Sequence, residues 1–167
     1  GIEKIKDFEF DYVLMLGSDD IICSKLLDVY SAEMEKGTDL IGLIDCYFLD
    51  SRVDKLSFWS GYRNHRRGES IGMARCLSRG LLMRMDWNVW TSPVNKGLDS
   101  LMMKNIGLIP YSKKMFSCKE EGIAAIDIKT DINISNINTY KNLKTEPFNY
   151  LSNFVSEEEF YNILKLK

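Results

Sequence analysis

The sequence is poor in the residues from which most zinc sites and disulfide frameworks are built. It has a single histidine, His65, and four cysteines that lie far apart in the chain and form no Cys-x-x-Cys pair. Widely spaced cysteines in a chain of this size favour reduced, partly buried thiols over disulfides or zinc ligands, and they indicate a cytoplasmic protein. Because no cluster of histidines or cysteines surrounds it, His65 is not expected to bind a metal.

Several other features are missing as well. No apolar run reaches the roughly 18 residues that a membrane-spanning helix needs, no secretory signal is visible, and there is no internal repeat. The net charge of −2 gives no electrostatic attraction toward nucleic acid or an acidic membrane surface. A chain of 167 residues, 45% of them hydrophobic, is the right size for one globular domain with its own core. It starts with Gly1 rather than Met, which suggests a fragment.

The chain is organised around a strand, a polar turn and a helix near its start. Residues 12–16 are apolar and aromatic and end at a Gly-Ser pair, which predicts a buried strand. Asp19 and Asp20 follow where that strand ends, and helical spacing begins at about Ser24, the expected N-cap. Because open α/β folds bind ligands at the carboxyl ends of strands, the two carboxylates should face a cleft and suit a hard divalent cation. The alternative is that Ser18 or Asp20 only caps the next helix.

The segment Leu16-Gly-Ser-Asp-Asp-Ile-Ile resembles the Asp-x-Asp metal motif of nucleotide-sugar glycosyltransferases with the GT-A fold. The likeness is greatest to the inverting, family-two-like group. In that motif, acidic residues hold Mn²⁺ or Mg²⁺ against the diphosphate of the sugar donor. The resemblance therefore implies that Asp19 and Asp20 bind the metal and the donor, and the Ser-Asp-Asp spelling leaves open which carboxylate touches the metal.

Residues 71–79 carry a second resemblance to the same group. They resemble a small-residue strand of the form Gly-x-Ala/Gly-x-x-x-Ser-Arg, which lies under the donor sugar and runs into a helix. Small residues such as Gly72 let the backbone approach a bound sugar closely. The resemblance implies that Gly72 and Arg75 help to bind the donor. Arg75 and Arg79 have an equal alternative, which is to pair with Asp86 or another carboxylate at the edge of the core.

Asp99 is the third match, and it follows the first two in the order that the family has. The apolar spacing over residues 98–106 predicts a helix closed by Gly107. In the group, an acidic residue that opens the helix after the acceptor loop is the usual catalytic base, which implies that role for Asp99. The competing interpretation is that Asp99 is the N-cap of this helix, a position that Asp favours.

Two loops complete the expected site. The turn-rich loop of residues 86–97 contains Trp87 and Trp90, which we expect to bind the acceptor by stacking on a sugar, with Trp90 the better candidate. Both tryptophans are alternatively core residues, the commoner fate of this residue type. The loop of residues 63–72 has three arginines around His65. They could bind the donor diphosphate or an anionic acceptor, or simply form a solvated surface loop.

The resemblance covers residues 10–107 and implies an α/β fold, a GT-A-like (Rossmann-like) mixed sheet with flanking helices. Few residues precede the first strand, whereas the family has a nucleotide-binding half at that place. The chain therefore looks like the second half of such a domain, and a partner chain or a missing N-terminal half would supply the rest.

Local patterns outside the three matches predict further elements. Residues 39–49 read as a strand, and residues 56–62 as its hairpin partner. Residues 122–129 read as another strand. The C-terminal extension, residues 108–167, ends in a helix with a capping box from Ser156 to Glu159.

We expect residues 1–167 to form a single glycosyltransferase-like domain. Its expected function is metal-dependent transfer of a sugar from a nucleoside-diphospho-sugar to an acceptor that the sequence does not identify, with inversion, as in hexosyltransferases. The cation would act as a Lewis acid on the departing diphosphate. The alternative is a non-catalytic interaction or structural protein with the same fold, in which the aromatic loop, Met102 and Met103 form a partner surface. A metal-dependent phosphoesterase would need more His and Asp ligands.

Overall fold

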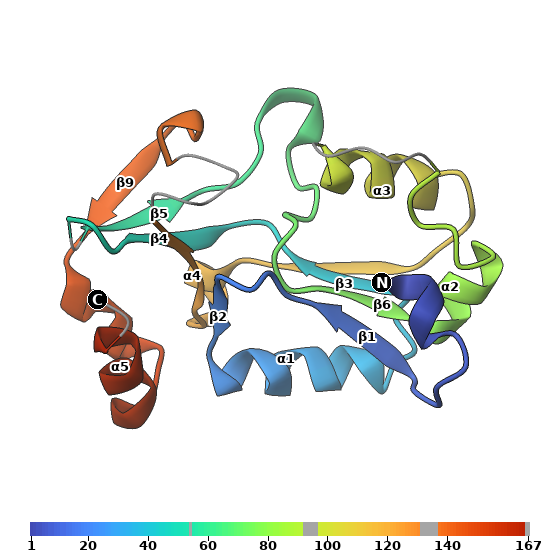
Figure 1. Cartoon of the computed structure of the whole chain (residues 1–167), viewed down its shortest axis with the longest axis horizontal. Helices are drawn as coiled ribbons and strands as arrows, with labels where there is room; N and C mark the ends of the chain where they lie inside the picture. The colour runs from blue at the N-terminus through green and yellow to red at the C-terminus, as the bar shows by residue number, and fades with distance from the viewer. Residues whose placement is uncertain (54, 92–96, 131–136, 166–167) are drawn as a thin grey trace.

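The computed structural model describes residues 1–53, 55–91, 97–130 and 137–165, and within them the chain is an α/β protein with two mixed sheets and flanking helices (Figure 1). The strands are β1 (Tyr12–Met15), β2 (Asp20–Ile22), β3 (Leu40–Leu43), β4 (Cys46–Asp50), β5 (Lys55–Trp59), β6 (Arg75–Ser78), β7 (Lys113–Phe116), β8 (Ala125–Lys129) and β9 (Leu143–Glu146). The helices are α1 (Ser24–Met34), α2 (Arg79–Arg84), α3 (Leu98–Ile106), α4 (Cys118–Glu121) and α5 (Glu157–Leu164), with 3-10 turns η1 (Ile2–Ile5), η2 (Asn64–Arg66), η3 (Ile137–Thr139) and η4 (Phe148–Asn153).

One sheet has four strands in the order β1-β6-β3-β7. Strand β6 runs antiparallel to both of its neighbours, β1 and β3, whereas β3 and β7 are parallel. Strand β6 leads directly into α2, whose N-cap is Ser78. Strand β1 forms one edge of this sheet among the described strands.

The second sheet has five strands in the order β2-β8-β4-β5-β9. The predicted hairpin is confirmed, since β4 and β5 pair antiparallel from Cys46↔Trp59 to Asp50↔Lys55. Strand β8, part of the strand predicted over residues 122–129, is parallel to β4 and antiparallel to β2. The β2–β8 register puts Asp20 directly opposite Asp127.

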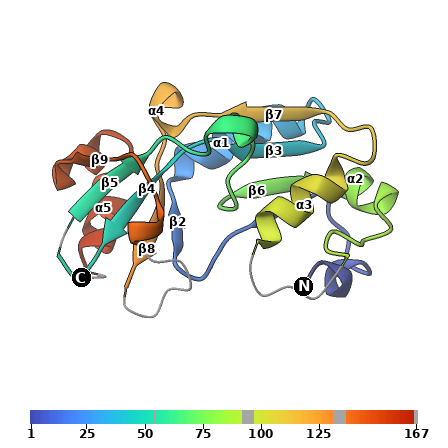
Figure 2. The ribbon, with the colours of Figure 1, turned by 90° about the horizontal axis from the view of Figure 1, so that it is seen from above.

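The helices cover the four-stranded sheet on both sides. Helix α1 lies below it in Figure 1 and α3 above it, and Figure 2 shows α3 crossing in front of β6. Leu26 and Tyr30 of α1 belong to the larger buried cluster, and Met102 and Ile106 of α3 to the smaller one. In β3, Ile41 and Leu43 belong to the larger cluster and Leu40 to the smaller one, because neighbouring side chains of a strand point to opposite faces.

The strand predicted over residues 39–49 is divided between the two sheets, so the prediction of one strand is wrong. Asp45 lies at the break and is buried, with its carboxylate accepting hydrogen bonds from the Ser117 hydroxyl at 2.5 Å and the Cys118 N–H at 2.6 Å. A buried carboxylate needs hydrogen-bond donors, and these two bonds supply them. The backbone bonds of one continuous strand would not. The polar residue therefore marks where the chain passes from β3 to β4.

Helix α1 is capped from the other end of the sequence. Its N-cap is Cys23 rather than the predicted Ser24, and no side chain of its own caps it. Instead, the Ser24 N–H donates to Glu159 Oε1 at 2.9 Å. Glu159 also closes the predicted capping box of α5, which is confirmed, because its Oε2 accepts from the Ser156 N–H. One carboxylate thus ties the C-terminal helix to the start of α1.

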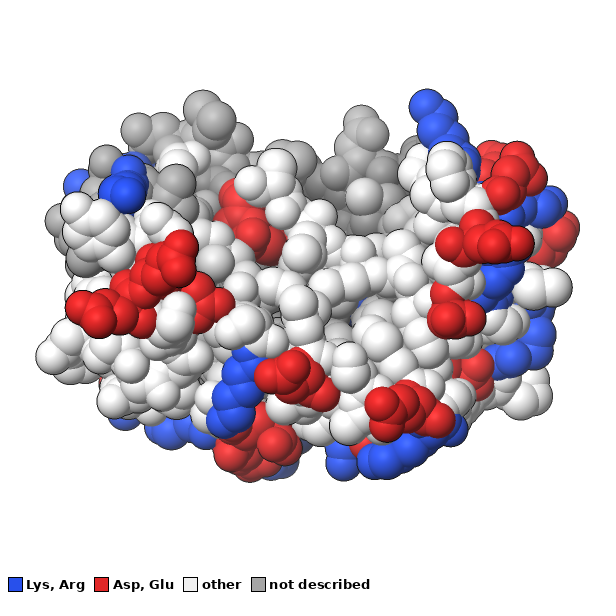
Figure 3. Space-filling model, turned by 90° about the horizontal axis from the view of Figure 1, so that it is seen from below, with Lys and Arg blue, Asp and Glu red and all other residues white. Residues whose placement is uncertain are grey.

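On the face shown in Figure 3, charges of both signs are mixed. Seen from below, red and blue side chains lie side by side along the edges of the molecule, and the middle of this face is largely uncharged (Figure 3). All four cysteines are buried free thiols. Among the described helices, none is both long and apolar enough to cross a membrane.

Candidate functional site

Three carboxylates from distant parts of the sequence line one cavity of about 260 Å³. Asp20 comes from β2, Asp99 from α3 and Asp127 from β8. The remaining lining residues are Gly17, Cys46, Phe48, Trp59, Tyr62, Ile71, Gly72, Met73 and Tyr140. The cavity therefore combines an acidic end with aromatic walls. We refer to it below as the acidic cavity.

A glycine turn positions the paired aspartates. The Gly17 N–H donates to Asp20 Oδ2 at 2.6 Å, and the Ile128 N–H donates to the Asp19 carbonyl at 2.9 Å. A β-carbon on Gly17 would lie 2.8 Å from Asp19 Oδ1 and 3.0 Å from Asp20 Oδ2, so both carboxylates lie close over this glycine. Because Cys23 is the N-cap of α1, the alternative that Ser18 or Asp20 caps the helix is wrong.

The environment of Asp20 makes its negative charge unfavourable. Burial raises the pKa of Asp20, and the negative charges of Asp19 and Asp99 raise it further, while the Gly17 N–H and the Lys129 ammonium act in the opposite direction. A bound cation would relieve this repulsion. Clustered, partly desolvated carboxylates with this property are typical of functional sites.

Asp127 is a member of the acidic cavity that the sequence analysis did not identify. Its Oδ2 accepts from Lys129 Nζ at 2.6 Å, and its Oδ1 is buried with no hydrogen-bond partner among the described residues. Burial, opposed by Lys129, raises the pKa of Asp127 to about 6. Lys129 itself is 3% exposed and lies over the Phe48 and Tyr140 rings. The sequence did contain a signal for this site, because Asp127 and Lys129 are two charged residues on one face of an otherwise apolar strand.

Asp99 is the second residue of α3, and it is not the helix cap. The N-cap is Gly97, which has the left-handed φ of +74°. The competing interpretation of Asp99 as N-cap is therefore wrong. Its side chain is 48% exposed, and Oδ1 lies 3.8 Å from Arg75 Nη1. Gly72 lies directly beneath it, since a β-carbon there would be 2.5 Å from both carboxylate oxygens.

Arg75 is a buried support for Asp99. Its Nη2 donates to the Ser70 carbonyl at 2.8 Å, and Nη1 lies 3.0 Å from Met102 Sδ. The arginine is fully buried, and Asp99 is its ion-pair partner among the described residues. Of the two predicted roles for Arg75, pairing with a carboxylate is the one that this geometry supports, and the partner is Asp99 rather than Asp86.

Arg79 has a structural position away from the acidic cavity. Its guanidinium donates to the carbonyls of Phe8 and Lys6, and it lies 5.4 Å from the Trp87 ring centroid. These contacts hold the N-terminal segment against α2.

The predicted acceptor-stacking tryptophans do not line the acidic cavity. Trp87 is 9% exposed and packs edge-on against Phe10, with ring centroids 6.2 Å apart. Trp90 is half-buried, and its Nε1 donates to the Leu98 carbonyl at 3.2 Å. Part of the predicted loop, residues 92–96, lies outside the described residues. The aromatic walls of the cavity are instead formed by Trp59, Tyr62 and Tyr140. The first two lie in the predicted hairpin partner, residues 56–62, and Tyr140 lies in the C-terminal extension.

The donor set fits a hard divalent cation only in part. Among the described residues, no group of three or more His, Cys, Asp or Glu side chains is arranged to hold a metal ion. Mg²⁺ commonly binds through one or two carboxylates, with substrate phosphates completing its shell. Asp19 and Asp20 over Gly17 match that kind of site, and the unpartnered Oδ1 of Asp127 adds a nearby acceptor. The protein would therefore hold a cation together with a ligand that brings its own oxygens.

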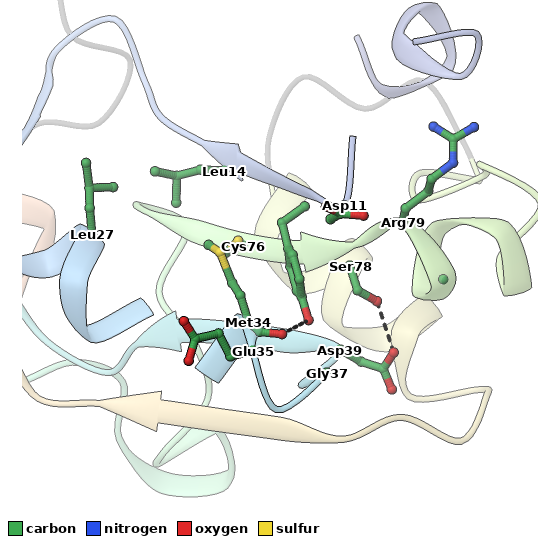
Figure 4. Close-up of a pocket in the computed structure, with 12 residues that line it drawn as sticks. Asp11, Leu14, Leu27, Met34, Glu35, Gly37, Asp39, Cys76, Ser78 and Arg79 are labelled. Atoms are coloured by element: carbon green, nitrogen blue, oxygen red, sulfur yellow. Dashed lines mark hydrogen bonds between the residues drawn. The ribbon is translucent and has the colours of Figure 1, made fainter. Parts of the chain in front are cut away.

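A larger groove of about 840 Å³ lies elsewhere, along β1 and α1 (Figure 4). Leu14, Leu27 and Cys76 give it an apolar wall, and the Tyr12 hydroxyl donates to the Met34 carbonyl across it at 3.2 Å. Asp39, at its polar end, accepts from the Ser78 hydroxyl at 3.0 Å, as the close-up shows. None of the three carboxylates of the acidic cavity lines this groove.

Comparison with known proteins adds no family to this description. No protein-family model matches the chain, and no curated protein sequence matches it significantly.

Proposed function

We propose that this domain is a metal-assisted glycosyltransferase that moves a sugar from a nucleoside-diphospho-sugar to an acceptor hydroxyl, with inversion. One observation carries the proposal: Asp20 and Asp99, which the family resemblance pairs as donor-side and acceptor-side acids, line the same cavity. The α/β class with mixed sheets and flanking helices is compatible with it.

Asp99 has the position that a general base needs. Inverting transfer requires a group that takes the proton of the acceptor hydroxyl as its oxygen bonds to the anomeric carbon and the bond to the diphosphate breaks. The Asp99 carboxylate is accessible at the cavity, and Arg75 holds it from the buried side. Gly72 leaves the space in which the carboxylate rests.

Asp19 and Asp20 form the donor end of the proposed site. These carboxylates would hold a Mn²⁺ or Mg²⁺ ion, which would supply positive charge against the departing diphosphate. The Gly17 N–H fixes one oxygen of Asp20, and the neighbouring Lys129 ammonium balances part of the negative charge of Asp20 and Asp127.

The aromatic walls supply the contact with the sugar. Sugar rings have apolar faces, and Trp59, Tyr62 and Tyr140 present aromatic surface beside the carboxylates.

The first test is binding of Mn²⁺ together with UDP or GDP, measured by calorimetry. We expect the parent protein and Asp28→Ala, a control on the exposed face of α1, to bind equally. Asp20→Ala should bind at least roughly tenfold more weakly, because it removes a charged ligand. An unchanged affinity in Asp20→Ala contradicts the metal role.

A non-catalytic interaction protein is the second candidate, and one observation favours it. The groove of Figure 4 adjoins the edge strand β1, and Leu27, which lines it, is 46% exposed. Exposed apolar side chains near an unpaired strand edge are typical of partner surfaces. If neither diphosphate binds with Mn²⁺ to the parent, this second function takes precedence.

A further inference from the structure

A second cavity, of about 540 Å³, adjoins the acidic cavity and has the opposite charge. It is lined by Ile44, Ser60, Tyr62, Arg63, Asn64, Arg67 and Gly68. These residues belong mainly to the loop between β5 and β6, which rises above the sheets in Figure 1. We refer to it as the basic cavity.

The loop that forms the basic cavity has a defined backbone. Gly61 has φ of +80°, and a β-carbon there would lie 1.8 Å from the Ile44 carbonyl oxygen, so only glycine allows the loop to cross the β3–β4 junction at this distance. The turn η2 follows, with Asn64 in the left-handed region at φ 57°. Residues 63 and 67 both line the basic cavity.

The three arginines of the loop have different roles. Arg66 pairs with Glu69 and lies 3.5 Å above the centre of the Tyr62 ring, so it is committed to holding the loop. Arg63 and Arg67 are exposed and form no ion pair or side-chain hydrogen bond with any other described residue. Two guanidinium groups at one cavity, each with free N–H donors, are suited to a carboxylate or phosphate group.

Tyr62 connects the basic cavity to the base side of the proposed site. It lines both cavities. Asp99, the proposed base, lines the acidic cavity together with Tyr62. Neither Asp20 nor Asp99 lines the basic cavity itself. The loop that forms it continues to Gly72, on which the Asp99 carboxylate rests, and this connection puts an anion bound between Arg63 and Arg67 on the acceptor side of the site.

We propose that the basic cavity binds an oxyanion, a phosphate or a carboxylate, that is carried by the acceptor substrate. The inference rests on the proposed function, because it takes Asp99 as the base and the Asp20 end as the donor position. Binding there would hold the acceptor with a neutral hydroxyl at Asp99 and its charged group at Arg63 and Arg67. The acidic cavity by itself repels an anionic acceptor, and the two arginines offset that repulsion.

The test is direct binding of small acceptor-like probes to protein that has been freed of metal and dialysed free of chelator. Glycerol 3-phosphate tests the phosphate, glucuronate tests the carboxylate, and glycerol and glucose are their neutral counterparts. We expect the parent to bind at least one anionic probe in the millimolar range and neither neutral one. The variant Arg63→Gln/Arg67→Gln should lose roughly tenfold or more in affinity, because two charge-assisted contacts are removed. The control Lys4→Gln/Lys6→Gln changes the net charge equally at exposed lysines of the N-terminal segment and should bind like the parent.

Two comparisons separate this inference from the proposed function. Asp20→Ala should retain the anionic probe, and Arg63→Gln/Arg67→Gln should retain Mn²⁺ with nucleoside diphosphate. Equal probe binding in the arginine variant and the parent, or no probe binding in the parent, overturns the oxyanion site. Loss of Mn²⁺–diphosphate binding in the arginine variant assigns the cavity to the donor and overturns the acceptor role. If the parent binds the probe through the arginines but never binds Mn²⁺–diphosphate, the proposed function fails and the acceptor role falls with it.

Discussion

The carboxylate of Asp99 rests directly on the α-carbon of Gly72. A β-carbon on residue 72 would lie 2.5 Å from both Asp99 oxygens, well inside contact distance. The two residues come from the segment before β6 and from the start of α3, so their contact exists only in the folded chain. A side chain at residue 72 would therefore change the position of the Asp99 carboxylate, the proposed base.

Gly72→Ala should therefore move the Asp99 side chain and reduce turnover by about tenfold or more, because a displacement of about 1 Å at a reacting group is costly. Stability should change little, since the atoms that the methyl group meets belong to a half-exposed side chain that can rotate. The control is Gly80→Ala in α2, where the nearest non-neighbouring atom is Arg84 Nη1 at 3.6 Å. It should preserve turnover and slightly stabilise the helix. Equal turnover in Gly72→Ala and the parent would show that the position of Asp99 is unimportant.

Asp99→Asn should abolish most turnover while leaving the affinity for Mn²⁺ and nucleoside diphosphate unchanged, because an amide cannot accept the acceptor's proton. Donor binding by calorimetry and transfer by product analysis measure the two effects separately. Thermal unfolding should occur at a lower temperature than in the parent, because the fully buried Arg75 loses its charged partner. Full turnover in this variant, with or without a loss of stability, is incompatible with a base role.

The ion pair between Asp127 and Lys129 in β8 predicts that the stability of the protein depends on pH. The pKa of Asp127 is raised to about 6 in the native state, against about 3.9 in an unfolded chain. Between these values the native state binds a proton that the unfolded state has lost, so the free energy of unfolding falls as pH rises, by at most about 1.4 kcal/mol per pH unit. Urea unfolding from pH 4.5 to 7.5 measures this slope.

Asp127→Asn/Lys129→Met removes both charges of this pair and should flatten that slope. The matched control is Asp50→Asn/Arg52→Met. There the Arg52 side chain lowers the pKa of Asp50, so the contribution of that pair is lost only at pH below the unfolded pKa. The control should keep the slope of the parent between pH 4.5 and 7.5. Parallel curves for the parent and the β8 variant would rule out the proposed titration.

Glu159→Gln should destabilise the protein by about 1 kcal/mol, because its carboxylate receives N–H bonds from both Ser156 and Ser24. The same hydrogen bonds lower the pKa of Glu159. Its contribution is therefore present above the unfolded pKa and disappears as pH falls through the native value. Urea unfolding at pH 7 compares it with Glu158→Gln, an exposed neighbour in the same first turn. A loss of equal size in both variants would mean that the general charge at the helix start matters, not the two specific bonds.

The local elements could be predicted from the amino-acid sequence, because the signals for them lie within short segments. Helical spacing defined α1 and α3, and the Ser156–Glu159 pattern defined the capping box of α5. The β4–β5 hairpin and the strand before Asp19 were also predicted, since apolar runs and turn residues lie within a few positions of each other. The prediction that this first strand is buried is wrong, because β1 is a half-buried edge strand. The family resemblance implied the α/β class with mixed sheets and flanking helices, and the structure confirms that class.

Which side chains share a cavity depends on the tertiary structure and could not be predicted from the sequence. Asp127 joined Asp20 through the β2–β8 register, which no short pattern encodes. Trp59 and Tyr140, rather than Trp87 and Trp90, became the aromatic wall, because Trp87 packs on the N-terminal segment while β5 carries Trp59 to the cavity. The strand break at Asp45 and the cap that Glu159 gives to α1 likewise depend on partners far away in the chain. Periodicity within a segment fixes which face of an element is apolar, whereas the contents of a site depend on how those faces meet.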